Sequence, residues 1–130
     1  MIYDTNLLIK HIRQNIPLPV ALVIPIVIVG ELEAFALKAD WGYQKIFQLQ
    51  QILDTYPIVA IDRELTRVYA QVDAYSQGKL TLINFTARNM GKNDIWIAAT
   101  ALYLNLELHT ADKDFDHLQN FGLKLINVSL

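Results

Sequence analysis

Four carboxylates interrupt apolar runs of this chain, and they are Asp4, Glu31, Asp94 and Asp112. Carboxylates are rarely buried unless they are paired or bind a cation. If the fold gathers these four side chains, the expected product is a cluster of oxygen ligands of the kind that Mg²⁺ and Mn²⁺ prefer. Such a cluster predicts a metal-dependent enzyme that acts on a phosphodiester.

A carboxylate cluster of this kind can hold one or two divalent cations, which polarise a phosphoryl oxygen and lower the pKa of a bound water. A further carboxylate can orient that water or accept its proton. Thr5 and Asn6 directly follow Asp4, so their side chains could bind a phosphate or orient Asp4 through hydrogen bonds.

Each acid also has an ordinary structural explanation. Asp4 could cap a following helix, and Asp94 could be a first-turn acid that the helix dipole stabilises. Asp112 could be a turn residue, and Glu31 could face solvent. The four together are harder to explain in this way. The chain's three histidines lack ligand-like spacing, so we expect no catalytic role for them.

Composition limits the class of protein. The chain has 130 residues, 53% of them hydrophobic and 18% charged, which predicts one domain over residues 1–130 with a full core and an apolar oligomer face. The absence of cysteine excludes disulfides and thiolate metal sites. A net charge of −2 argues against a basic nucleic-acid coat but not against a nuclease with an acidic centre.

No membrane association is expected. The most apolar stretch, Pro17–Val29, has 13 residues and three prolines, whereas a membrane-spanning helix needs about 20 apolar residues. The N-terminus also lacks a basic region followed by a cleavage-like site. We therefore expect a cytoplasmic protein.

Strands and helices are expected to alternate. The predicted strands cover residues 1–4, 20–24, 56–61, 107–110 and 123–128. The predicted helices cover residues 7–13, 26–38, 41–53, 63–75, 94–104 and 113–121. Asp40, Asp62 and Asn93 are expected to cap helices, and residues 79–92 are ambiguous. This order predicts an α/β fold with a mostly parallel sheet.

The predicted elements place the acids near one another. Asp4 ends the first strand and Asp112 follows a later one, and ligands of open α/β sheets bind beyond the carboxyl ends of the strands. Asp94 lies in the first turn of its helix. Glu31 lies on a helix among apolar neighbours, on the side expected to face the sheet.

Four segments resemble the motifs of PIN-domain ribonucleases. They are Met1–Ile9 around Asp4, Val29–Leu32 with Glu31, Asn93–Ala101 with Asp94, and His109–Phe115 with Asp112. The size and the order of motifs are similar to those of the VapC toxins of type II toxin–antitoxin systems. The resemblance covers essentially the whole chain, and it implies a three-layer α/β/α sandwich.

The resemblance also implies an activity and partners. The chain would be a Mg²⁺- or Mn²⁺-dependent endoribonuclease that cleaves RNA, forms a homodimer and is inhibited by a VapB-like antitoxin. Its metal ligands would be the four acids, with Asp112 favoured over Asp114, and Asp114 and Thr110 would support the site. The alternatives are a PIN nuclease in RNA maturation without an antitoxin, an inactive PIN binding module and, with a poor fit, a phospho-acceptor domain.

Two features depart from the family pattern. Pro25 replaces the small polar residue often found at the end of the second strand, and the segment Lys79–Lys92 is longer than the usual link before the third motif. Within that segment Arg88 and Lys92 could contact RNA phosphates, or the segment could be a solvated loop.

Overall fold

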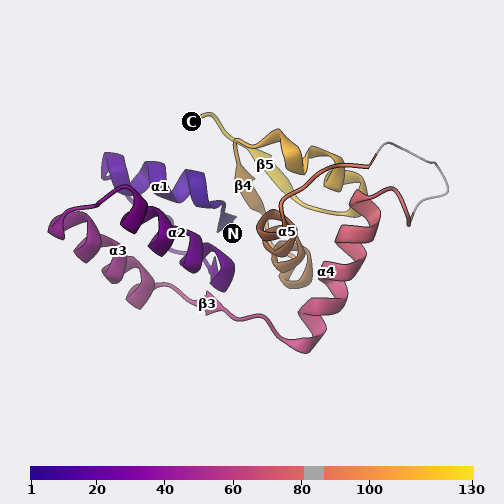
Figure 1. The fold of residues 1–130 in the computed structure, drawn as a ribbon, viewed down its shortest axis with the longest axis horizontal. Coiled ribbons are helices and arrows are strands. Elements are labelled where there is room, and N and C mark those ends of the chain that lie inside the picture. The colour runs from indigo at the N-terminus through magenta and orange to yellow at the C-terminus, as the bar shows by residue number, and fades with distance from the viewer. Residues whose placement is uncertain (81–86) are drawn as a thin grey trace.

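The computed structural model describes residues 1–80 and 87–130, in which strands and helices alternate (Figure 1). The strands are β1 (Ile2–Tyr3), β2 (Ile24–Pro25), β3 (Ile58–Val59), β4 (Leu108–Thr110) and β5 (Leu125–Asn127). The helices are α1 (Thr5–Gln14), α2 (Ile26–Lys38), α3 (Tyr43–Thr55), α4 (Arg63–Ser76), α5 (Lys92–Leu104) and the 3-10 helix η1 (Lys113–Phe121).

Every pairing between the described strands is parallel. β1, β4 and β5 form one sheet in that order, and β2 pairs with β3 in another. A backbone bond of 3.0 Å from Val23 N to Met1 O connects the two sheets. β1 and β4 therefore lie side by side, and the residues that follow them, Asp4 and Asp112, emerge at the same edge.

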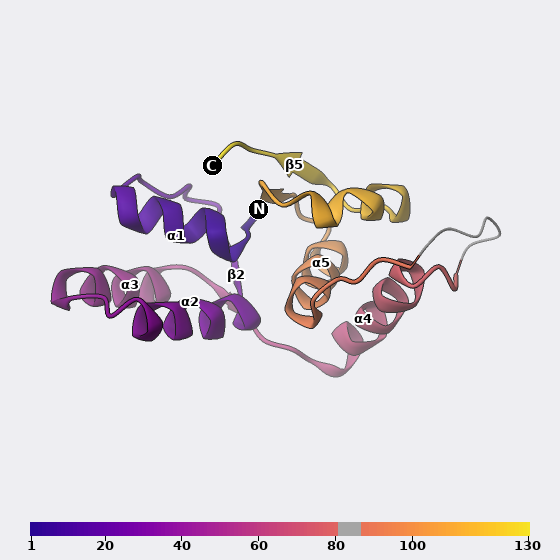
Figure 2. The same cartoon turned by 45° about the horizontal axis from the view of Figure 1, so that its top comes forward.

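Helices flank the strands on both sides. α1, α2 and α3 gather at one side of the molecule, and α4, α5 and η1 gather at the other (Figures 1 and 2). Ile2, Leu108, Ile28 and Ile95 are fully or almost fully buried, so strands and helices from both sides share one core. The predicted α/β fold with a parallel sheet is confirmed.

The second and third strands are shorter than predicted. Of the segment expected at residues 20–24 only Ile24 belongs to a strand, and Val20 lies in a turn with 97% of its surface exposed. The pairing is limited to Ile24–Pro25 opposite Ile58–Val59. Prolines lack the amide that a longer ladder needs, and one stands at each of positions 19, 25 and 57.

Two of the three predicted helix caps are wrong. Asp40 has a left-handed backbone, with φ of 52°, and α3 begins only after Gly42. α5 begins at Lys92, so Asn93 lies inside its first turn and its side chain is available for another contact. The third cap is confirmed, because Asp62 accepts a 2.8 Å hydrogen bond from the amide of Leu65.

The ambiguous segment 79–92 lies only partly within the structure, because residues 81–86 fall outside the described ranges. Residues 87–91 are described and have no regular secondary structure. Among the described helices none is long and apolar enough to cross a bilayer.

Candidate active site

Asp4 is the buried centre of the site and is 6% exposed. It caps α1, because its Oδ1 accepts a 3.0 Å hydrogen bond from the amide of Leu7. Its Oδ2 accepts a hydrogen bond from the hydroxyl of Thr110 at the end of β4. The Thr110 hydroxyl oxygen in turn accepts the amide of Asp112 at 2.9 Å. One oxygen of Asp4 therefore caps α1, and the other connects Asp4 to the end of β4.

The environment of Asp4 disfavours its charged form. Burial raises the pKa of Asp4, and the negative charges of Asp112 and Glu31 raise it further. The hydrogen bonds from Thr110 and Leu7 lower the pKa, but they do not outweigh the burial. A nearby cation would favour the ionised form.

Three carboxylates converge beside Asp4. Asp94, in the first turn of α5, Asp112 and Asp114 each offer an oxygen, and these oxygens lie within 4.8 Å of one another. Asp112 caps η1 by accepting the amide of Asp114 at 2.9 Å. Burial, followed by the charges of Asp112, Glu31, Asp4 and Asp114, raises the pKa of Asp94 to about 6. The arrangement concentrates negative charge with no cationic side chain in the group.

Glu31 reaches the same site from α2. Its Oε1 accepts a 2.6 Å hydrogen bond from the hydroxyl of Thr5, and its Oε2 accepts a 3.3 Å hydrogen bond from the side-chain amide of Asn93. Glu31 is therefore held between α1 and α5, and it does not belong to the group of three oxygens. The contact from Asn93 was missed at the level of sequence, where this residue was interpreted as a helix cap.

One cleft of about 630 Å³ contains all four predicted acids. Its polar lining includes Asp4, Thr5, Asn6, Glu31, Asn93, Asp94 and Asp112. Ile9 and Phe35 contribute apolar surface, and Lys38 adds a cation. Lys38 was not predicted, although it lies seven residues after Glu31, a spacing that places two residues on one face of a helix.

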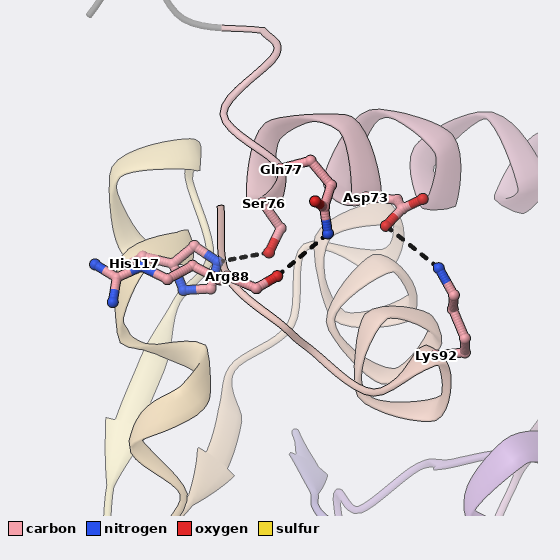
Figure 3. Close-up of polar contacts among 6 residues, drawn as sticks. All are labelled: Asp73, Ser76, Gln77, Arg88, Lys92 and His117. Atoms are coloured by element: carbon pink, nitrogen blue, oxygen red, sulfur yellow. Dashed lines mark hydrogen bonds and ion pairs between the residues drawn. The ribbon is translucent and has the colours of Figure 1, made fainter. Parts of the chain in front are cut away.

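The two cations proposed for RNA binding lie elsewhere. Lys92 forms an ion pair with Asp73 of α4, with Nζ 3.7 Å from Oδ1, and its side chain is 70% exposed (Figure 3). Arg88 lines a second cleft together with Asp114. In the described part of the chain, neither cation lines the acidic cleft.

The second cleft also involves a histidine that the sequence did not single out. His117 of η1 lines it, and its Nε2 lies 3.0 Å from the hydroxyl of Ser76 at the end of α4. These partners are 41 residues apart, and no spacing rule connects them.

Comparison with known proteins identifies the class of fold. The family model for the PIN domain matches residues 1–120. The chain therefore belongs to the PIN domain family, as its motifs predicted. No curated protein matched the chain.

Several solved toxin–antitoxin complexes contain a chain of similar fold. VapBC2 from Rickettsia felis, bound to a DNA fragment from its promoter, is 23% identical, with 98% of each chain covered and a TM-score of 0.73. VapBC-1 from nontypeable Haemophilus influenzae is 23% identical, with 98% of each chain covered and a TM-score of 0.66. VapBC-5 from Mycobacterium tuberculosis is 22% identical, and the match covers 98% of this chain and 97% of the VapBC-5 chain with a TM-score of 0.66. At these identities the similarity is one of fold.

Proposed function

We propose that this protein is a divalent-metal-dependent endoribonuclease and the toxin of a type II toxin–antitoxin pair. The observation that carries the proposal is the convergence of carboxylates from four separate segments on one cleft of a PIN domain. Structural roles explain Asp4 and Asp112 in part, because both cap helices. Helix capping does not explain why Asp94 and Glu31 lie in the same cleft as Asp4 and Asp112.

The donor set fits a hard divalent cation. The three converging oxygens belong to Asp94, Asp112 and Asp114, and carboxylate oxygens are the ligands that Mg²⁺ and Mn²⁺ prefer. The raised pKa of Asp94 and that of Asp4 fit a site whose negative charge lacks a counter-charge. A cation bound there would stabilise charge on a phosphoryl group and lower the pKa of a bound water.

The chain's own residues divide the remaining tasks. Thr5 and Asn93 each hold one oxygen of Glu31, so this carboxylate keeps a fixed position from which it can accept a proton from an attacking water. Thr110 and the amide of Leu7 fix Asp4 in the same way. Lys38 lines the cleft and can contact a phosphate of the RNA.

The proposed partners follow from the same similarity. The three solved structures named above are VapBC complexes, which supports a VapB-like antitoxin as the cognate partner. Tyr43 and Phe47 lie one turn apart on α3 and are 87% and 51% exposed, which supports a homodimer. Toxicity through cellular RNA requires that the protein acts in the cytoplasm.

The proposal is tested by digestion of RNA with the purified protein. We expect cleavage with Mg²⁺ or Mn²⁺, none with a chelator, and a loss of at least about 100-fold in the Asp94→Asn variant. Asp54→Asn is the matched control, because Asp54 is exposed on α3 and should leave cleavage unchanged. A folded wild-type protein that cuts no RNA with either metal, or an equally active Asp94→Asn variant, would contradict the proposal.

A further inference from the structure

A second cleft of about 490 Å³ is lined in part by the residues that directly follow Asp112 of the acidic cleft. Its lining comes from two segments, residues 88–90 before α5 and residues 113–120 of η1. Asp112 lines the acidic cleft, whereas Lys113 and Asp114 line the second. Oxygens of Asp112 and Asp114 lie within 4.8 Å of each other, so the two clefts come close together at this segment.

The end of α4 fixes both walls of this cleft (Figure 3). The backbone of Arg88 is held twice, because its amide donates to Ser76 O at 2.9 Å and its carbonyl accepts from Gln77 Nε2 at 3.3 Å. His117 contacts the hydroxyl of the fully buried Ser76, and its ring lies parallel to that of Tyr75, with centroids 6.5 Å apart. The backbone of Arg88 and the ring of His117 are therefore held in place by α4.

The two side chains also lie close enough to interact. Burial, followed by the charge of Arg88, lowers the pKa of His117. The planar ring of His117 offers a face on which a nucleobase can stack.

The lining of the cleft mixes donors and acceptors. Arg88 and Lys113 are cations, Asp114 and Asp116 are carboxylates, and Asn89 and Asn120 carry amides. Two positive and two negative groups give little net attraction for a bare polyanion. A nucleotide suits both kinds of group, because its phosphate accepts hydrogen bonds from cations and its base presents donors to carboxylates and amides.

We propose that the second cleft binds the nucleotide adjoining the phosphodiester that is cleaved and selects its base. This inference rests on the proposed ribonuclease function. Arg88 and Lys113 hold the phosphate of this nucleotide, His117 supports its base, and Asp116 and Asn120 contact the edge of the base. The acidic cleft performs the reaction, and the second cleft determines which RNA sequence is cut.

The test uses single-stranded RNA oligonucleotides that differ only in the base beside the cleaved bond. Arg88→Gln should raise KM about tenfold for all of them and leave kcat nearly unchanged, because a phosphate contact carries no sequence information. Asp116→Asn and Asn120→Ala should reduce the preference among bases about tenfold. Arg67→Gln on the exposed face of α4 and Asp54→Asn are the matched controls and should behave like the wild type.

The outcomes separate this proposal from the proposed function. If the wild type cleaves RNA but all three cleft variants match it in KM and base preference, the cleft proposal is overturned and the ribonuclease stands. An equal loss of cleavage for every base in Asp116→Asn and Asn120→Ala would also overturn base selection.

If the wild type cleaves nothing, fluorescence anisotropy with a labelled oligonucleotide still tests whether the second cleft binds RNA. Arg88→Gln should then bind about tenfold more weakly, and an equal Kd would overturn the proposal.

Discussion

The ionised carboxylate of Asp94 lowers the stability of the metal-free protein. Its pKa rises from the usual 3.8 to about 6, so the folded protein binds the proton of this carboxyl more tightly than the unfolded chain does. Stability therefore falls as the pH rises from about 4 to about 6. Above that window the ionised carboxylate destabilises the metal-free fold by about 1 kcal/mol, once solvent screening of this half-exposed group is allowed for.

Replacement of Asp94 by Asn should remove this cost. We expect the variant, in the presence of a chelator, to be about 1 kcal/mol more stable than the wild type at pH 7.5. The difference should vanish near pH 4, where the wild-type carboxyl is protonated. Urea denaturation of both proteins between pH 4 and pH 7.5 measures this difference in the free energy of unfolding. A difference that is absent at pH 7.5, or that does not change with pH, would contradict the raised pKa of Asp94.

Thr5 should act on catalysis only through Glu31. Its hydroxyl donates a 2.6 Å hydrogen bond to Glu31 Oε1, so Thr5→Val should lower kcat for RNA cleavage roughly tenfold and leave KM nearly unchanged. Thr5→Ser keeps the hydroxyl and should restore most of the rate. Thr66→Val removes a comparable hydroxyl on the exposed side of α4 and serves as the control. Equal rates for Thr5→Val and Thr5→Ser would show that the hydrogen bond has no catalytic role.

At the scale of elements, the cap of α4 illustrates a purely structural carboxylate. Asp62 accepts the amide of Leu65 at 2.8 Å, so Asp62→Ala should lower the free energy of unfolding by about 1 kcal/mol without changing RNA cleavage. Asp54→Ala, in the last turn of α3, should cause no such loss because an acid there gains nothing from the helix dipole. Equilibrium denaturation of the two variants distinguishes these results, and equal stabilities would contradict the assigned cap.

The sequence predicts elements best where periodicity and a single capping side chain act together. α4 with Asp62 was predicted close to its observed bounds for this reason. The segment 20–24 has the composition of a buried strand, but the course of the chain leaves Val20 in an exposed turn. Asn93 has the chemistry of a cap, yet α5 begins at Lys92, two residues before its predicted start, and the side-chain amide of Asn93 donates to Glu31 instead.

At the scale of the whole molecule, the parallel sheet explains why the acidic cleft could be predicted and the second cleft could not. Asp4 and Asp112 follow neighbouring parallel strands, so the alternation of elements already places them at one edge. The second cleft depends on packing between the end of α4 and η1, where Ser76 meets His117. No local pattern encodes that contact, so Lys113, Asp116 and Asn120 could not be selected from the sequence alone.

Calorimetric titration of Mn²⁺ into the purified protein at pH 7.5 measures directly whether the gathered carboxylates form a metal centre. The wild type should bind the cation, and Asp94→Asn should bind it at least about tenfold more weakly, because one of three converging oxygens loses its charge. The control Asp54→Asn should match the wild type. Equal dissociation constants for the wild type and Asp94→Asn, or no binding in the folded wild type, would show that these carboxylates do not form a metal centre.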